Sequence, residues 1–229
     1  MDLLQLREKE IFETLGKIRN FKFAVIGGYA INAYTLPRFS ADCDIVLEND
    51  IEAKRIGKEL EKFGYKRKGA GKTEQYHGKF VKYEKEIQKN FRVSIDIMVS
   101  NVFDRHTKAN FSAKWVFENS VTRLVKGKTI PDKLGLRVIS IDALIAMKFI
   151  SCRTADIRDV FMLMPQAKDI NLNWIKREIS NRYDFEDRFK MIKDKITSVQ
   201  FKNNLQGVYG YVDKTAFEKH KKAILTFSE

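Results

Sequence analysis

The chain contains few of the residues that mark an exported, disulfide-linked or zinc-stabilised protein. Its 229 residues include two cysteines, three histidines and three prolines. Cys43 and Cys152 each stand in an apolar segment, which is typical of a reduced thiol in the core of a cytoplasmic protein. The three histidines are far apart in the sequence and match no zinc-binding spacing. We therefore expect neither a disulfide framework nor a structural metal.

Long hydrophobic runs are also missing. The richest apolar stretch, ALIAMKFI, is interrupted by Lys148 and has about half the length that a bilayer span requires. The amino-terminal MDLLQLREKEIFETL lacks the basic-then-apolar order of a signal peptide. We therefore expect an ordered cytoplasmic protein without a membrane partner.

Acidic residues are outnumbered by basic ones. There are 43 Lys and Arg against 30 Asp and Glu, which gives a formal net charge of +13. Such a charge favours a polyanionic partner such as RNA. Lysine richness also accompanies solubility and thermal adaptation, so the charge alone leaves RNA binding open.

Hydrophobic periodicity predicts helices and strands in alternation, followed by a helical carboxyl-terminal part. Strands are predicted over residues 21–26, 42–47, 74–84, 91–99, 121–130 and 136–139. Helices are predicted over 3–19, 29–36, 51–63, 111–119, 141–152 and 156–164, and residues 170–229 are helical in pattern and basic. The pattern predicts an α+β fold with a core domain at 1–135 and a mainly helical region at 136–229.

Two carboxylates stand two positions apart in the strand predicted at 42–47. Asp42 and Asp44 project from one face of this strand, and Cys43 points to the other. Bound divalent cations remove the repulsion between two such carboxylates. Asp96 lies on the polar side of the alternating segment 91–99, where it is placed to complete a site for two ions, Mg²⁺ or Mn²⁺. The competing interpretation is that the two acids of Asp-x-Asp only form the solvent-exposed face of an antiparallel strand.

A glycine pair precedes these acids. Gly27 and Gly28 follow an apolar run, and glycine allows a tight strand-to-helix turn whose backbone N–H groups approach a triphosphate closely. Either motif alone is more often an ordinary turn or an ordinary strand. Their occurrence together, in this order and with a third acid on a later strand, favours a nucleotide site.

The spacing of these motifs resembles that of the nucleotidyltransferase superfamily, which has the polymerase-beta-like fold. Gly27-Gly28, then thirteen residues, then Asp42-Cys43-Asp44-Ile45 follow the hallmark of that superfamily. The resemblance implies a mixed sheet flanked by helices, with metal-binding and catalytic roles for Asp42, Asp44 and Asp96.

A second segment resembles one group within that superfamily. Lys148, Arg153, Asp156 and Asp159 follow the Lys-x4-Arg-x2-Asp-x2-Asp pattern of the AbiEii-like toxin nucleotidyltransferases, and Arg38-Phe39-Ser40-Ala41-Asp42 resembles the segment that enters their acidic motif. The resemblance implies transfer of a nucleoside monophosphate from an NTP to an acceptor hydroxyl, with an antitoxin protein as partner. The acceptor is RNA, by resemblance the end of a tRNA, or a protein hydroxyl, or a small molecule, and the net charge favours RNA. It also implies that residues 136–229 complete the active-site cleft. The nucleotide-binding residues implied are Gly27, Gly28, Arg38, Ser40, Lys148, Arg153 and Asp159.

Lys148 is anomalous even without the resemblance. It falls near the middle of an apolar helical stripe, and an unpaired buried ammonium is expensive. We expect it to meet a carboxylate or a bound phosphate, and to support catalysis. The alternatives are that Lys148 reaches past the apolar surface to water, and that Arg153, Asp156 and Asp159 form a surface ion-pair ladder.

Gly71-Lys72-Thr73 imitates the end of a phosphate-binding P-loop, but Lys66 occupies the position of its leading glycine. We interpret this segment as a basic loop. The leading hypothesis is thus a magnesium-dependent nucleotidyltransferase. The alternative is a non-catalytic nucleic-acid-binding or toxin–antitoxin partner protein on the same scaffold.

Overall fold

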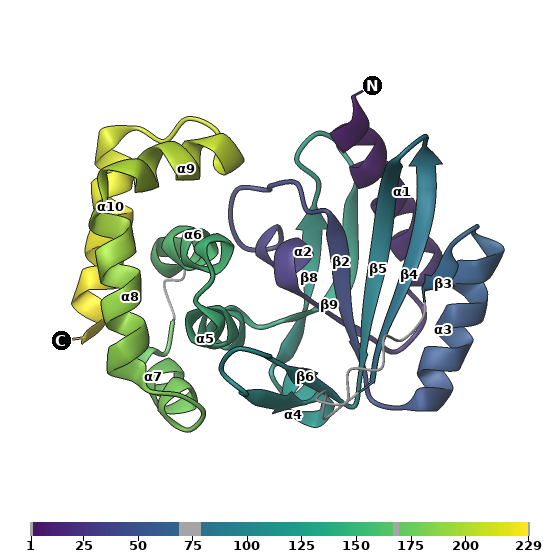
Figure 1. The fold of residues 1–229 in the computed structure, drawn as a ribbon, viewed down its shortest axis with the longest axis horizontal. Helices are drawn as coiled ribbons and strands as arrows, with labels where there is room; N and C mark the ends of the chain where they lie inside the picture. The colour runs from purple at the N-terminus through teal and green to yellow at the C-terminus, as the bar shows by residue number, and fades with distance from the viewer. Residues whose placement is uncertain (1, 69–78, 167–169, 229) are drawn as a thin grey trace. The chain divides into compact units, whose positions relative to one another are not determined.

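The computed structural model describes residues 2–68, 79–166 and 170–228 (Figure 1). The chain divides into two compact units. The first unit comprises Met1–Ala33, Pro37–Arg105 and Asn110–Ile139, and the second comprises Tyr34–Leu36, His106–Ala109 and Ser140–Glu229. Gly71-Lys72-Thr73 lies outside the described residues.

A seven-stranded mixed sheet forms the centre of the first unit, with strand order β3-β4-β5-β2-β1-β9-β8. Two neighbouring pairs, β2 with β5 and β1 with β9, are parallel, and the other neighbours are antiparallel. The strands are β1 (Ala24–Ile26), β2 (Asp42–Leu47), β3 (Lys66–Lys68), β4 (Lys79–Gln88), β5 (Phe91–Val99), β8 (Ser120–Lys126) and β9 (Lys133–Ile139).

The helices of the first unit pack on this sheet through apolar residues at helical spacing. In α1 (Leu3–Ile18) the buried residues include Ile11, Leu15 and Ile18, and α3 (Asp50–Lys62) buries Ile56 and Leu60. Both helices contact β5 (Figure 1). The remaining elements of this unit are the five-residue helix α2 (Gly27–Ile31), α4 (Ala113–Glu118), and the separate two-stranded pair β6 (Asn101–Phe103) and β7 (Asn110–Ser112).

The second unit is helical and has an aromatic core. Its helices are α5 (Ile141–Ser151), α6 (Thr154–Leu163), α7 (Leu172–Ser180), α8 (Phe185–Thr197), α9 (Val199–Tyr209) and α10 (Lys214–Leu225), with short 3-10 turns at Met164–Gln166 and Thr226–Ser228. Phe149 of α5 stacks on Phe185 at 5.4 Å and meets the edge of Phe227 at 5.5 Å. None of the helices formed by the described residues is long and apolar enough to cross a membrane.

The predicted fold class, a mixed sheet flanked by helices with a helical carboxyl-terminal part, is confirmed. The prediction of a helix over residues 29–36 was wrong, since α2 begins at Gly27 and ends at Ile31. The Asn32 side chain explains this early end, because it bonds to the backbone of Arg38 and closes a turn. The first part of the strand predicted at 74–84 lies outside the described residues, and the boundary expected near residue 135 falls inside β9.

A buried carboxylate fastens the loop between β8 and β9 to the first helix. Glu8 of α1 is 2% exposed. Its carboxylate accepts hydrogen bonds from the backbone N–H of Lys128 at 2.5 Å and from the N–H and hydroxyl of Thr129 at 2.8 and 2.7 Å. These donors satisfy a charge whose burial would otherwise be costly. Glu8 therefore joins residues 120 positions apart in the sequence.

We expect Glu8→Ala to lower the free energy of unfolding by about 3 kcal/mol, because it removes several charge-assisted hydrogen bonds to the loop and truncates a buried side chain. Urea denaturation followed by circular dichroism measures this change. Glu13→Ala in the same helix is the matched control. Its side chain is 50% exposed and pairs with Lys9 at 3.8 Å, so the loss should stay below about 0.5 kcal/mol. Equal losses in the two variants would contradict the anchoring role of Glu8.

Candidate active site

Strand register brings the three predicted acids to one face of the sheet. Asp44 of β2 lies directly opposite Asp96 of the parallel strand β5, and Asp42 lies opposite Ser94. Residues opposite one another on adjacent strands point to the same face, and so do residues two apart on one strand. Asp42, Asp44 and Asp96 therefore share a face, and Ile97 points to the other face, towards α3.

The glycine turn lies against the second of these acids. Gly27 has φ +63°, a conformation that L side chains rarely adopt, and a Cβ atom at this residue would collide with the Asp44 carboxylate. Ile26, the residue before it, is the antiparallel partner of Asp44. Glycine is needed here both for the backbone angle and for the close approach. The turn and the carboxylate are thus immediate neighbours.

The segment before β2 packs on the second glycine. A Cβ atom at Gly28 would lie 2.9 Å from the Cβ of Ser40 and 3.3 Å from a guanidinium nitrogen of Arg38. The Ser40 hydroxyl is also 3.4 Å from Asp42 Oδ1. Gly27, Gly28, Arg38 and Ser40, four of the residues implied to bind nucleotide, are therefore gathered around Asp42 and Asp44.

Asn32 holds this segment in place, and the sequence interpretation missed it. Its side chain is fully buried. Asn32 Oδ1 accepts a hydrogen bond from the Arg38 N–H at 3.0 Å, and Nδ2 donates one to the Arg38 carbonyl at 2.9 Å. A polar residue in the apolar stretch YAINAYTL was the available signal, because a buried amide needs partners.

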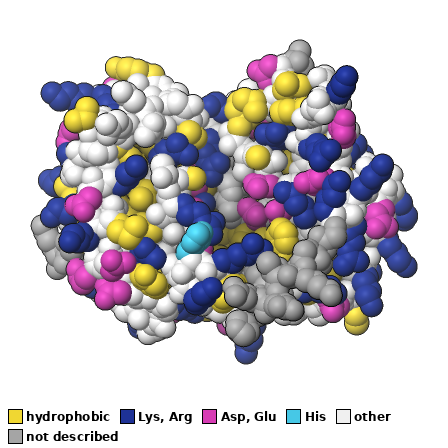
Figure 2. All heavy atoms as spheres, viewed as in Figure 1, with side chains coloured by type: hydrophobic (Ala, Val, Ile, Leu, Met, Phe, Trp, Pro, Cys, Tyr) yellow, Lys and Arg dark blue, Asp and Glu magenta, His cyan; other side chains and the backbone are white. Residues whose placement is uncertain are grey.

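The Asp96 carboxylate is buried in surroundings that disfavour its negative charge. It is 8% exposed, and its Oδ1 has no hydrogen-bond partner among the described residues. Burial raises the pKa of Asp96 above its ordinary value; the Lys82 ammonium, 3.9 Å from Oδ1, opposes this shift, and nearby Asp42 adds to it. Figure 2 shows acidic side chains gathered over the middle of the sheet with Lys and Arg beside them. The fold therefore holds a carboxylate in a setting that disfavours its charge.

The cysteine between the two motif acids is a core residue. Cys43 is fully buried, and burial together with the charges of Asp44 and Asp42 raises the pKa of its thiol. An uncharged thiol on the opposite side of the strand is a packing group and no nucleophile.

The donor set fits a divalent cation. Among residues 2–68, 79–166 and 170–228, no group of three His, Cys, Asp or Glu side chains has the arrangement of a ready-made metal site. Asp42, Asp44 and Asp96 are nevertheless the ligand type that Mg²⁺ and Mn²⁺ prefer. The buried, unpartnered oxygen of Asp96 and the repulsion from Asp42 are both relieved by a cation. Both the ligand type and the negative charge of these three side chains therefore suit a divalent cation.

Three of the other candidate residues, Lys148, Asp156 and Asp159, form a buried ion cluster in the second unit, and Arg153 beside them is exposed. Lys148 Nζ lies 2.7 Å from Asp156 Oδ1 and 2.9 Å from Asp159 Oδ2, and the lysine side chain is 13% exposed. Asp156 and Asp159 are 6% and 1% exposed. The expectation that Lys148 meets a carboxylate is confirmed. The surface-ladder alternative is wrong for Asp156 and Asp159, and the Arg153 N–H donates to Asp156 Oδ2 at 3.3 Å.

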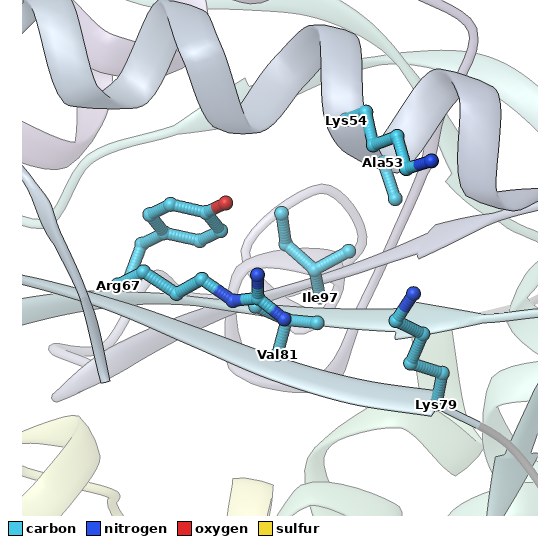
Figure 3. Close-up of a pocket in the computed structure, with 7 residues that line it drawn as sticks. Ala53, Lys54, Arg67, Lys79, Val81 and Ile97 are labelled. Atoms are coloured by element: carbon cyan, nitrogen blue, oxygen red, sulfur yellow. The ribbon is translucent and has the colours of Figure 1, made fainter. Parts of the chain in front are cut away.

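A small cavity lies on the α3 side of the sheet, away from the acids. It has a volume of about 70 Å³, and its lining includes Ile97 and Val81 of the sheet and Ala53 of α3 (Figure 3). Lys54, Arg67 and Lys79 stand around it, and Lys79 pairs with Asp50 at 2.9 Å. Its lining contains none of the candidate site residues.

Two solved structures share this architecture. JHP933 from Helicobacter pylori matches with a TM-score of 0.57 and 15% identity over 99% of this chain and 92% of that one. The nucleotidyltransferase toxin MenT4 from Mycobacterium tuberculosis matches with a TM-score of 0.55 and 12% identity over 99% of this chain and 83% of that one. No curated protein sequence matches the chain. The fold, with acids on adjacent strands beside a glycine turn, is that of a nucleotidyltransferase.

The family follows from the sequence. A family model described as the nucleotidyl transferase AbiEii toxin of type IV toxin–antitoxin systems matches residues 20–225. The chain belongs to this AbiEii family and is a nucleotidyltransferase. The resemblance drawn from the glycine turn, the two motif acids and the Lys148 segment is thereby confirmed.

We expect Asp96→Asn to stabilise the metal-free protein at pH 7 and to leave its stability unchanged near pH 3. Because the pKa of Asp96 is higher in the folded than in the unfolded state, its ionisation costs stability as the pH rises above about 4. Asparagine cannot ionise. Thermal unfolding in EDTA between pH 3 and pH 7 measures the change, which should reach about 2 °C at pH 7.

Asp132→Asn is the control for this prediction, because Asp132 is exposed and lies outside the sheet. Its melting temperature should follow that of the wild type at every pH. A lower melting temperature for Asp96→Asn at pH 7 would show that the Asp96 carboxylate is well accommodated without a cation.

Proposed function

We propose that this nucleotidyltransferase is metal-dependent, uses Asp42, Asp44 and Asp96 to hold Mg²⁺ or Mn²⁺, and transfers a nucleoside monophosphate from an NTP to an acceptor hydroxyl. The observation that carries the proposal is the pairing of Asp44 with Asp96 on parallel strands, directly beside the Gly27 turn. Bound divalent ions would neutralise the phosphates and the developing charge on the oxygens around the α-phosphorus.

The glycine turn and the segment before β2 would bind the triphosphate. Gly27 and Gly28 bear no side chain that could obstruct a phosphate, and their neighbours Ser40 and Arg38 offer a hydroxyl and a guanidinium. Asn32 keeps the backbone of Arg38 in position through two hydrogen bonds. The phosphates would thus be held beside Asp42 and Asp44.

Asp96 would orient the acceptor hydroxyl and receive its proton. A carboxylate within hydrogen-bond reach of the attacking hydroxyl accepts its proton in general-base catalysis. The hydroxyl oxygen forms a bond to the α-phosphorus, the bond from that phosphorus to the β-phosphate bridging oxygen breaks, and pyrophosphate leaves with the electron pair. Lys148, Arg153 and Asp159 are proposed as nucleotide-binding residues, with the Lys148 ammonium neutralising developing charge and the buried Asp159 acting through its ion pair with Lys148.

We propose an RNA acceptor, with the end of a tRNA as the first to test. The net charge of +13 supports a polyanionic substrate. The family is that of the toxins of type IV toxin–antitoxin systems, which supports a toxic role in the cytoplasm with an antitoxin as partner.

We expect the wild type to transfer label from α-³²P-NTPs to total RNA in Mg²⁺, and Asp42→Ala/Asp44→Ala to lose at least about 100-fold of this activity, a barrier increase of about 2.7 kcal/mol. Asp132→Ala, which changes an exposed acid between β8 and β9, is the matched control and should retain full activity. EDTA should abolish transfer and Mg²⁺ or Mn²⁺ should restore it.

Two outcomes would contradict the proposal. Label transfer that survives in the double variant or in EDTA would exclude the metal-binding role of the acids. Absence of transfer by the wild type, combined with RNA binding that weakens steeply with salt, would favour the non-catalytic RNA-binding alternative.

A further inference from the structure

A tyrosine outside every sequence motif contacts the ion cluster of the second unit. Tyr209 is the last residue of α9 and is 6% exposed. Its hydroxyl donates a hydrogen bond to Asp159 Oδ1 at 2.6 Å. The other carboxylate oxygen of Asp159 lies 2.9 Å from Lys148 Nζ. One carboxylate therefore connects Tyr209 to Lys148, across 50 residues of sequence from Tyr209 to Asp159.

The charges of the cluster make the orientation of Asp159 important. One ammonium, that of Lys148, faces two carboxylates, Asp156 at 2.7 Å and Asp159 at 2.9 Å. Two acids beside one base repel each other in a buried setting, so each carboxylate depends on further donors. The Arg153 N–H supplies one to Asp156, and the Tyr209 hydroxyl supplies one to Asp159.

Packing independent of the hydroxyl keeps α9 in place. Phe201 of α9 is fully buried and meets the Phe161 ring edge-on at 5.1 Å, and Leu205 is fully buried as well. Replacing Tyr209 by Phe would keep the ring and remove the hydroxyl that donates to Asp159 Oδ1. The substitution therefore tests this hydrogen bond while the apolar contacts of Phe201 and Leu205 hold α9 in place.

We propose that Tyr209 is a positioning residue, which sets the place of the Lys148 ammonium through Asp159. The inference that this matters for transfer rests on the role of Lys148 in the proposed function. The connection from Tyr209 through Asp159 to Lys148 rests only on the observed contacts and needs no assumption about activity. The positioning role would give α9, a helix with no recognisable motif, a part in orienting Lys148. Lys148 belongs to the segment that resembles the AbiEii-like nucleotidyltransferases.

The first experiment measures the environment of Lys148 without any need for activity. The full chain is treated with an amine-reactive N-hydroxysuccinimide ester, and the labelling rate of each lysine is followed by peptide mass spectrometry. Tyr209→Phe should raise the rate at Lys148 about fivefold, the equivalent of losing one hydrogen bond in the cluster, and leave the exposed Lys190 unchanged.

Tyr211→Phe is the matched control for this experiment. Tyr211 follows two residues later and is 83% exposed, so loss of its hydroxyl should change neither the labelling of Lys148 nor the transfer rate. Unchanged labelling of Lys148 in Tyr209→Phe would overturn the inference, whatever the activity of the protein.

The second experiment is a double-mutant cycle on transfer. Tyr209→Phe should lower kcat about tenfold with KM within about twofold of the wild type, because the affected group acts on developing charge. In the Asp159→Asn background the same substitution should change kcat by less than about twofold, since the hydroxyl acts through that carboxylate. If the fold-losses in kcat of Tyr209→Phe and Asp159→Asn simply multiplied in the double variant, the two residues would act independently and the inference would be overturned.

The two experiments separate this inference from the proposed function. Faster labelling of Lys148 in a protein whose wild type transfers no label would support the positioning by Tyr209 and contradict the transfer reaction. Metal-dependent transfer with unchanged kcat in Tyr209→Phe would support the reaction and overturn the positioning.

Discussion

The site depends on keeping three carboxylates on one face of a sheet where they repel one another. The parallel pairing of β2 and β5 places Asp44 opposite Asp96, and the two-residue period of β2 adds Asp42. A shift of one residue in this register would turn Asp96 to the α3 side and bring Ile97 into the site. Packing of α3 and α1 on the Ile97 side prevents that shift, because the aliphatic side chains of the strand are buried there. The hydrophobic core thus enforces an arrangement that electrostatics alone would disperse.

The negative charges of the carboxylates are compensated differently in the two groups of candidate residues. In the first unit Asp96 keeps an oxygen without a hydrogen-bond partner among the described residues, next to Asp42. In the second unit each carboxylate of the cluster has donors, Lys148 for both acids and the Tyr209 hydroxyl for Asp159. The first arrangement suits the capture of a cation. The second suits a lysine held in a fixed place.

Short-range patterns predicted much of this protein. The segment 42–47 matched β2 at both ends, and the helix predicted at 141–152 matched α5 to within one residue. Both have strong periodicity and clear boundaries. The helix predicted at 29–36 failed because its apolar pattern continued past the point where Asn32 bonds to the Arg38 backbone. Periodicity does not show which backbone groups a side chain bonds to six residues away, although a polar residue in an apolar stretch indicates that it needs partners.

The sequence by itself determined the family, the glycine turn, the acid pair on one strand face and the need of Lys148 for a charged partner. The family followed from the resemblance of the motifs to those of known nucleotidyltransferases. The glycine turn, the acid pair and the anomaly of Lys148 follow from the local spacing of residues, because strand and helix periods are fixed by backbone geometry. Only the tertiary structure decided that Asp96 is the register partner of Asp44, that Glu8 fastens a loop 120 residues away, and that Tyr209 reaches Asp159. Such contacts join distant segments, and their geometry is set by how the chain packs as a whole.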